Sequence, residues 1–222
     1  MFLCVYYMVV EIVFKRGGAN QPYVLFLLCG LIPFKFVSQS ISQSVTILPN
    51  TASVIKSISF PKAVLPLSTV FTNLVYFVFG MIIIIIAAVF YGSSHSTWPN
   101  LNYVHLISII VVMIMLVIGL SLIVSVVAVF FNDLRNILSH VIKAWYFASQ
   151  GLYSFDRLPD SILPYARLNP LAGIMNGFRE VIMWNHHPYN VDFMYASIVG
   201  FVLLSIGYYF FRRMETRLVK HI

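Results

Sequence analysis

Between Ala63 and Asn132 the sequence contains no aspartate, glutamate, lysine or arginine. A typical soluble domain is about one quarter charged, whereas only 9% of these 222 residues are charged and 60% are hydrophobic. A soluble domain of this size does not bury that much apolar surface. The sequence therefore predicts an integral membrane protein. Because the apolar runs are long and continuous rather than alternating, they favour an all-α fold over a β-barrel.

Six apolar segments are predicted to cross the membrane, since a span needs about 20 apolar residues. The polar stretch Gly92–Asn102 divides the uncharged run into two of them. The predicted spans cover residues 1–14, 22–48, 64–91, 103–131, 137–155 and 193–211 within one transmembrane domain, 1–222. The first would measure only about 21 Å. Either the natural start lies upstream of Met1, or residues outside this sequence complete that helix.

The distribution of basic residues predicts that both termini are cytoplasmic, because loops on that side are enriched in lysine and arginine. Seven basic residues then lie inside and five outside. The inner ones are Lys56, Lys62, Arg135, Arg212, Arg213, Arg217 and Lys220, and the outer ones are Lys15, Arg16, Arg157, Arg167 and Arg179. The net charge of +7 is thus assigned to membrane flanks, and no nucleic-acid partner is expected.

Motifs for enzymatic chemistry are missing from the sequence. There is no P-loop GxxxxGK[ST], no HExxH and no Cys/His set with zinc spacing. We therefore expect no ATP site, no metal and no catalytic residue in this chain. Lys143 is the most informative charge within a span, and two interpretations stay open. It lines a path through the membrane, or it reaches back to the cytoplasmic headgroups.

The stretch VIKSISFPKAVLPLS, Val54–Ser68, interrupts two apolar spans with two lysines and two prolines. Asn50, Thr51 or Ser53 is expected to cap a short helix that Pro61 ends. A plain charged turn does not need the apolar residues of this stretch, so we interpret residues 50–63 as a docking element with an exposed apolar knob. The alternative is a basic stop at the lipid headgroups. The residues proposed for docking are Val54, Ile55, Lys56, Ile58, Phe60, Pro61 and Lys62.

The longest segment between spans, residues 156–192, is too apolar for a flexible loop. Apolar residues recur in it at helical spacing from Leu171 to Ile182, and Pro170 suits a first helical turn. We predict one or two short amphipathic helices that lie at, or dip into, the outer leaflet. The alternative is an extracellular cap packed on the helix ends.

Several stretches, in order along the chain, resemble ABC-2 type permeases that export polysaccharides, O-antigen or teichoic acid. They are YVLFLLCGLIPFKFVSQSISQS (23–44), PNTASVIKSISFPKAVLPLS (49–68), FNDLRNI (131–137), SQGLYSFDRLP (149–159) and RLNPLAGIMNGFREVI (167–182). The third stretch matches a cytoplasmic turn of the family, carried here by Asp133 and Arg135. The fourth has Gln150 where the family usually has a proline.

The resemblance implies a half-transporter in a bacterial inner membrane. Two copies of the chain would form a pore, and two copies of a separate ABC ATPase, which binds ATP and magnesium, would dock on residues 50–63. The cargo would be a lipid-linked glycan or polyol-phosphate polymer. Tyr6, Tyr7, Lys143, Tyr146 and Tyr153 would line the path. Asn169, Pro170, Phe178 and Arg179 would belong to an outer gate.

Three other functions are weighed against this one. An ABC-2 permease with another lipid or a drug as cargo would share the same motifs. A self-sufficient channel or carrier needs charges at the membrane midplane, which the central spans do not offer. An intramembrane transferase needs acid–base or metal residues at the membrane surface, and no convincing set is present.

Overall fold

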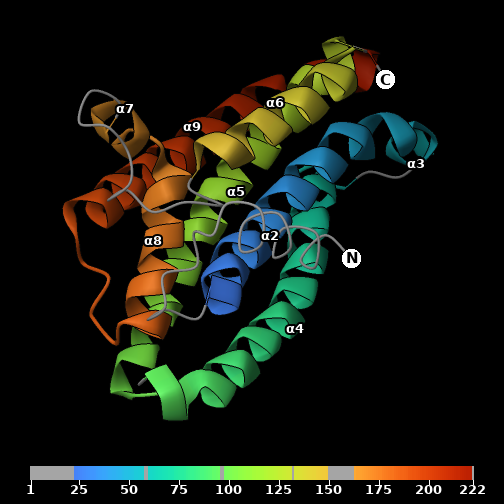
Figure 1. Cartoon of the computed structure of the whole chain (residues 1–222). Helices are drawn as coiled ribbons and strands as arrows, with labels where there is room; N and C mark the ends of the chain where they lie inside the picture. The colour runs from blue at the N-terminus through green and yellow to red at the C-terminus, as the bar shows by residue number, and fades with distance from the viewer. Residues whose placement is uncertain (1–22, 58–59, 96–97, 132, 150–162, 222) are drawn as a thin grey trace.

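The computed structural model describes residues 23–57, 60–95, 98–131, 133–149 and 163–221, and every regular element within them is a helix (Figure 1). The all-α prediction is therefore confirmed for the described part of the chain. The helices are α2 (Tyr23–Asn50), α3 (Ala52–Ser57), α4 (Val64–His95), the 3-10 helix η2 (Leu101–Val104), α5 (His105–Phe130), α6 (Leu134–Ala148), α7 (Leu163–Arg167), α8 (Pro170–Met183) and α9 (Val191–His221).

Within the described residues, four stretches are long and apolar enough to cross a membrane: α2, α4, η2 together with α5, and α9. They correspond to the predicted spans 22–48, 64–91, 103–131 and 193–211. The chain is thus a multi-pass helical membrane protein. Helix α9 continues beyond the predicted end at Phe211, because Phe211 and Leu218 are both buried against other helices. The predicted span 1–14 lies outside the described residues.

The predicted span 137–155 is not reproduced as one helix. Helix α6 ends at Ala148, and its 15 residues measure only about 22 Å at 1.5 Å per residue. The Ser149 hydroxyl donates to the Trp145 carbonyl at 2.5 Å, and the Ser149 amide donates to the Tyr146 carbonyl at 3.2 Å. These bonds take the place of the regular helical ladder and end the helix. The remaining predicted residues, 150–155, lie outside the described residues.

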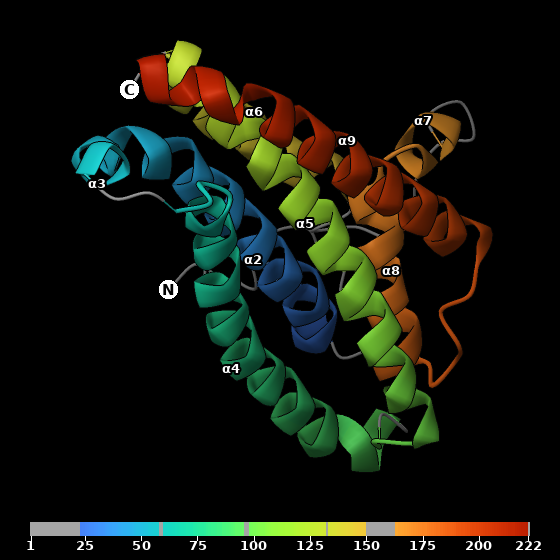
Figure 2. The ribbon, with the colours of Figure 1, turned by 180° about the vertical axis from the view of Figure 1, so that it is seen from behind.

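Helix α5 lies at the centre of the bundle and packs most extensively against α9, then against α2. Figure 2 shows α9 crossing α5 on one side of the molecule. The main hydrophobic core joins α2, α4, α5 and α8, and a smaller cluster at the α3 end joins Leu48, Ile55, Leu122, Val126, Phe211 and Leu218. "The α3 end" here means the end of the bundle that carries α3, the start of α4 and the C-terminus (Figure 1).

The prediction of an amphipathic helix at the outer leaflet is not confirmed by helix α8. Its helical spacing is as predicted, with Pro170 in the first turn. However, its apolar residues, and even Gly173 and Arg179, are buried, because α8 packs against α9, α2 and α5. The amphipathic pattern therefore reflects contact with protein along most of the helix.

Candidate functional site

The stretch predicted to dock a partner folds as a short helix and a tight turn at the α3 end. Thr51 ends α2 by donating its hydroxyl to the Ile47 carbonyl at 2.6 Å, and its own carbonyl accepts the Ile55 amide at 3.0 Å to start α3. After Pro61, the Val64 amide donates to the Pro61 carbonyl at 3.1 Å, which opens α4. Pro66 then lies in the first turn of α4, where a missing amide proton costs little.

The two apolar residues of this segment whose side chains are described, Ile55 and Phe60, are not part of the expected exposed knob. Ile55 is 4% exposed and packs in the small cluster with Leu48, Phe211 and Leu218, and Phe60 packs against the same cluster. Burial there shields apolar surface that a docking knob would present to a partner. Lys56, Ser57 and Pro61 are exposed instead, and Lys62 is partly exposed. Ile58 and the Val54 side chain lie outside the described part.

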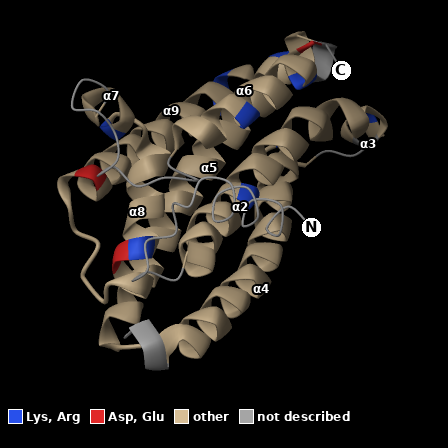
Figure 3. Cartoon of the chain, viewed as in Figure 1, with Lys and Arg blue, Asp and Glu red and all other residues tan. Residues whose placement is uncertain are grey.

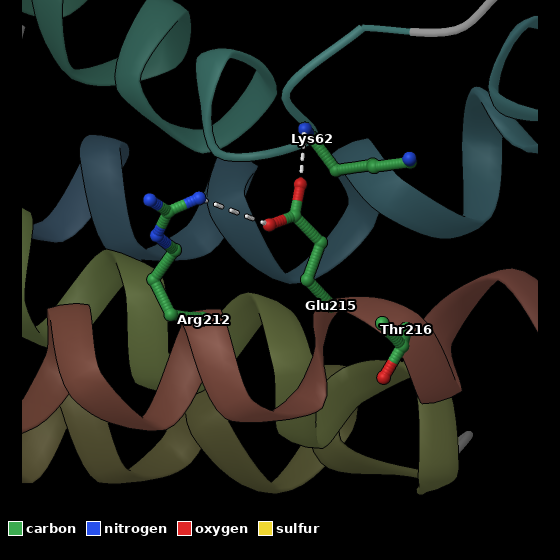
Figure 4. A pocket seen from close by; sticks show the side chains of 4 residues that line it. All are labelled: Lys62, Arg212, Glu215 and Thr216. Carbon is green, nitrogen blue, oxygen red and sulfur yellow. Dashed lines mark hydrogen bonds and ion pairs between the residues drawn. The ribbon is translucent and has the colours of Figure 1, made fainter.

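Glu215 of α9 anchors the turn that precedes α4 (Figure 4). One of its carboxylate oxygens accepts the Lys62 backbone amide at 3.0 Å, and the other lies 3.9 Å from a guanidinium nitrogen of Arg212. The Lys62 side chain extends away from Glu215, so the contact depends on the backbone (Figure 4). With Thr216, these three residues line a pocket. Glu215 was not predicted from the sequence, although it is the one acidic residue in the basic stretch RRMETRLVK.

Glu215→Ala is expected to loosen the turn at Lys62, whereas Glu215→Gln is expected to retain it. Alanine removes the acceptor of the Lys62 amide, and a hydrogen bond to a charged group contributes about 1.5 kcal/mol. Amide hydrogen exchange at Lys62 should then be about tenfold faster. Arg212→Gln is the matched control, since Arg212 is largely exposed and its ion pair is expected to add little. Equal exchange in wild type and Glu215→Ala would contradict an anchoring role.

The turn residues Asp133 and Arg135 are both exposed at the start of α6. The Asp133 carbonyl accepts the amides of Asn136 and Ile137, at 3.1 and 3.2 Å, and so begins the helix. Figure 3 shows basic residues near the C-terminus, on α3 and along α6, with few acidic residues beside them. The α3 end is therefore predominantly basic.

The described candidate path residues lie in different environments. Lys143 is exposed on α6, and Tyr146, one turn further along α6, is buried. The ring of Tyr146 contacts that of Phe34 on α2, with 4.6 Å between the ring centroids. Tyr6, Tyr7 and Tyr153 lie outside the described residues.

Asn169 joins the end of α6 to the start of α8. Its side-chain oxygen accepts the indole N–H of Trp145 at 3.0 Å and caps α8 by accepting the Leu171 amide at 3.1 Å. Its amide group donates to the Ser149 hydroxyl at 2.8 Å and to the Ala148 carbonyl at 3.2 Å. One side chain thus connects the helix of Lys143 to the helix of Phe178 and Arg179. The partner Trp145 was not predicted, because contacts between separate helices leave no local signal.

Phe178 and Arg179 of the predicted outer gate are core residues of α8. Phe178 is fully buried and makes an edge contact with Phe77 of α4, at 6.1 Å between centroids. Arg179 is 1% exposed, and its guanidinium carbon lies 3.6 Å from the centroid of the Phe26 ring. A cation over an aromatic face is stabilised by the ring quadrupole. These two residues hold α8 against α2 and α4.

Among the described residues, no group of three or more histidine, cysteine, aspartate or glutamate side chains could hold a metal ion. The described geometry therefore defines a helical membrane protein with a basic end. The short helix α3 packs against α9 at that end, and the side chain of Asn169 joins the end of α6 to the start of α8.

Protein-family models give no match to the sequence. Individual proteins do match along nearly the whole chain. An O-antigen export system permease protein RfbA of Klebsiella pneumoniae is 29% identical over 222 residues, which are 99% of this chain and 83% of that protein. RfbA of Myxococcus xanthus is 25% identical over 206 residues, 92% and 77% of the two chains. The polysialic acid transport protein KpsM of Escherichia coli is 24% identical over 211 residues, 91% and 78% of the two chains.

These similarities agree with the motifs quoted above and extend over the same residues. The chain is thus similar, along nearly its whole length, to permeases named for O-antigen export and polysialic acid transport.

Proposed function

We propose that this chain is the membrane-spanning subunit of an ATP-driven exporter that moves a lipid-linked polysaccharide across a bacterial inner membrane. The supporting observation is its similarity, over 91–99% of its length, to permeases named for O-antigen export and polysialic acid transport. The same similarity favours a transport subunit over an enzyme. A teichoic-acid-like polymer, another lipid or a drug-like molecule stays the alternative cargo.

In this proposal two copies of the chain form the pore, and two copies of a separate ABC ATPase supply the energy and hold ATP and magnesium. The α3 end then faces the cytoplasm, with both termini, because its many basic residues suit that side. The ATPase would contact the exposed surface of α3 and the following turn, which includes Lys56, Ser57 and Pro61. The opposite end would face the outside of the cell.

Anchoring of the α3 segment supports a role in transmitting force. Ile55 and Phe60 fix the segment in the small cluster, and Glu215 holds Lys62 to α9. A push on α3 would therefore move α4 and α9 together with it, rather than bend a loose loop. A basic surface that only meets lipid headgroups has no need of such an anchor.

The test is export in proteoliposomes that contain the permease with or without its ATPase subunit. We expect lipid-linked glycan to appear on the far side only with both subunits and ATP. Lys56→Glu should weaken ATPase binding about tenfold without lowering thermal stability, because the Lys56 side chain is exposed. Phe60→Ala should lower the thermal stability, because Phe60 packs in the small cluster. Export without an ATPase, or without ATP, would overturn the proposal in favour of a self-sufficient carrier.

A further inference from the structure

Helix α2 carries a polar face within its membrane-spanning length. Its members recur three or four residues apart, which places them on one side of a helix. They are Lys35, Ser38, Gln39, Ser42, Gln43 and Thr46, here called the α2 polar face. Lys35, Ser42 and Gln43 are exposed, and the other three are partly exposed.

The opposite face of α2 is packed against the rest of the chain. It includes Phe36, Val37 and Ile41, which are buried in the main core. Ser44 also lies on this side, fully buried, within 3.0 Å of the Thr69 hydroxyl on α4. Ser42 and Ser44 therefore lie on opposite sides of one helix, two residues apart, in contrasting environments.

A polar face of this kind is costly against lipid. An ionised lysine at the centre of a bilayer is unfavourable by about 3 kcal/mol on insertion scales, and such residues generally face a water-filled cavity or a protein partner. Lys35 is not near either end of α2. It lies about 22 Å from Asn50 and about 18 Å from Tyr23 at 1.5 Å per residue. It is therefore too deep to be explained as a flanking charge.

Helix α6 presents a second exposed polar face. Arg135, Ser139 and Lys143 recur every four residues on α6, and all three are exposed. Lys143 lies about 14 Å from the start of α6. Figure 3 shows basic residues on both α2 and α6 in the same view.

The contact between Phe34 and Tyr146 relates the two faces to each other. Lys35 directly follows Phe34 along α2, and Lys143 lies one turn before Tyr146 on the antiparallel α6. Both lysines are thus on the α3 side of this aromatic contact. Beyond it, toward the other end, the side chains of α8 are buried in the core.

The charge on the two faces has one sign. Helix α2 contains no acidic residue, and α6 is preceded by a single one, Asp133. None of the ion pairs among the described residues includes Lys35 or Lys143. Two lysines that form no ion pair within the described part of the chain suit an anionic ligand, and hydroxyl and amide groups beside them can hydrogen-bond to it.

We propose that the α2 polar face and the exposed face of α6 together form a hydrated, anion-binding entrance, in which Lys35 and Lys143 bind the diphosphate group of a lipid-linked cargo. This inference rests on the proposed function for the identity of the cargo. The hydration and the anion preference of the entrance follow from the residues alone, and they can be tested without any cargo.

The first experiment labels single cysteines with water-soluble thiol reagents. The background carries Cys4→Ser and Cys29→Ala, and Ser42→Cys is compared with Ser44→Cys as the buried control on the same helix. We expect Ser42→Cys to react and Ser44→Cys to stay protected in the folded protein. A negatively charged reagent should react with Ser42→Cys about tenfold faster than a positively charged one of the same size, because the positive charges of Lys35 and Lys143 attract the anionic reagent and repel the cationic one.

Lys35→Gln and Lys143→Gln should each reduce this preference, and the double variant should abolish it. Arg213→Gln, at an exposed position of α9, should leave it unchanged. An unreactive Ser42→Cys would overturn the hydrated entrance. Equal rates for the two reagents would overturn the anion preference. A disulfide formed between two copies at Ser42→Cys would show a subunit contact in place of an entrance.

The second experiment identifies the source of the anion. The permease in nanodiscs of neutral lipid is titrated with a lipid diphosphate, with phosphatidylglycerol and with inorganic diphosphate. We expect the lipid diphosphate to bind tightest and to lose at least tenfold in affinity in the Lys35→Gln, Lys143→Gln variant. Equal binding of phosphatidylglycerol would overturn the assignment to cargo. If Ser42→Cys is labelled as expected but no ATP-driven export is observed, the hydrated entrance is supported and the proposed function is contradicted.

Discussion

Replacing Gly119 with alanine is expected to separate α5 from α9 and to destabilise the chain by more than about 3 kcal/mol. The added methyl group would clash with backbone atoms, which cannot move aside as a side chain can. A methyl group at Gly119 would lie 2.5 Å from the Leu203 carbonyl oxygen and 2.6 Å from the Leu204 nitrogen. Both atoms belong to the backbone of α9, so no side chain can rotate out of the way. Only movement of a whole helix can make room.

The crossing of α5 and α9 makes this position more sensitive than others. The two helices form the most extensive contact in the bundle, and a methyl group at Gly207 would meet the Gly119 carbonyl oxygen at 2.5 Å. Small residues at such a crossing let two membrane helices approach closely. Since α5 also packs against α2, α4 and α8, a shift of α5 would disturb the main core.

Two glycines provide graded controls for the same chemical change. A methyl group at Gly200 would lie 3.3 Å from the Val112 carbonyl oxygen, and one at Gly177 would meet only side-chain atoms, at 3.4 Å or more. Alanine at Gly177 is expected to be neutral or slightly stabilising, because alanine is the better helix former, and alanine at Gly200 should fall between. Thermal unfolding in detergent, followed by tryptophan fluorescence, measures the series. A Gly119→Ala protein as stable as Gly177→Ala would contradict the close crossing.

The sequence was sufficient to predict features that depend on local patterns. Apolar runs of adequate length predicted α2, α4, α5 and α9, since membrane insertion depends on summed hydrophobicity. The pattern of residues 50–61 predicted the short helix α3, although the Thr51 hydroxyl bonds back to α2 and does not cap it, and Pro170 predicted the start of α8. In each case the decisive interactions lie within a few residues of one another along the chain.

The sequence was insufficient where the outcome depends on distant partners. Ile55 is buried because α9 continues past the predicted span and brings Phe211 and Leu218 beside it. An apolar pattern such as that of α8 is the same whether its partner is lipid or protein, so the pattern could not reveal that α8 is buried. Glu215 and Lys62 are far apart in sequence, and their contact has no local signature.

Asn169→Ala is expected to uncouple α6 from α8, with a loss of about 3 kcal/mol in stability, because it removes a helix cap worth about 1 kcal/mol and further hydrogen bonds of about 1 kcal/mol each. The four partners of Asn169 are the Trp145 indole, the Leu171 amide, the Ser149 hydroxyl and the Ala148 carbonyl. Two of these are donors and two act as acceptors toward Asn169. A side-chain amide supplies two donor hydrogens together with an acceptor oxygen, whereas a hydroxyl has a single donor hydrogen.

Asn169→Asp separates the two roles of this residue and is the sharper test. Aspartate retains the acceptor for the Trp145 indole and the Leu171 amide, so α8 stays capped, but it places a carboxylate against the Ala148 carbonyl oxygen in place of a donor. We therefore expect Asn169→Asp to retain helix α8 and to release the end of α6, with quenching or shifted emission of Trp145 as the readout.

The proteoliposome assay should show reduced export by Asn169→Asp, because Lys143 and the core side chains of α8 would no longer move as one unit. Asn136→Asp, the same change at an exposed position of α6, should alter neither the fluorescence nor the export. If Asn169→Asp leaves both unchanged, then α6 and α8 are held together by apolar packing, and the hydrogen bonds of Asn169 do not couple them.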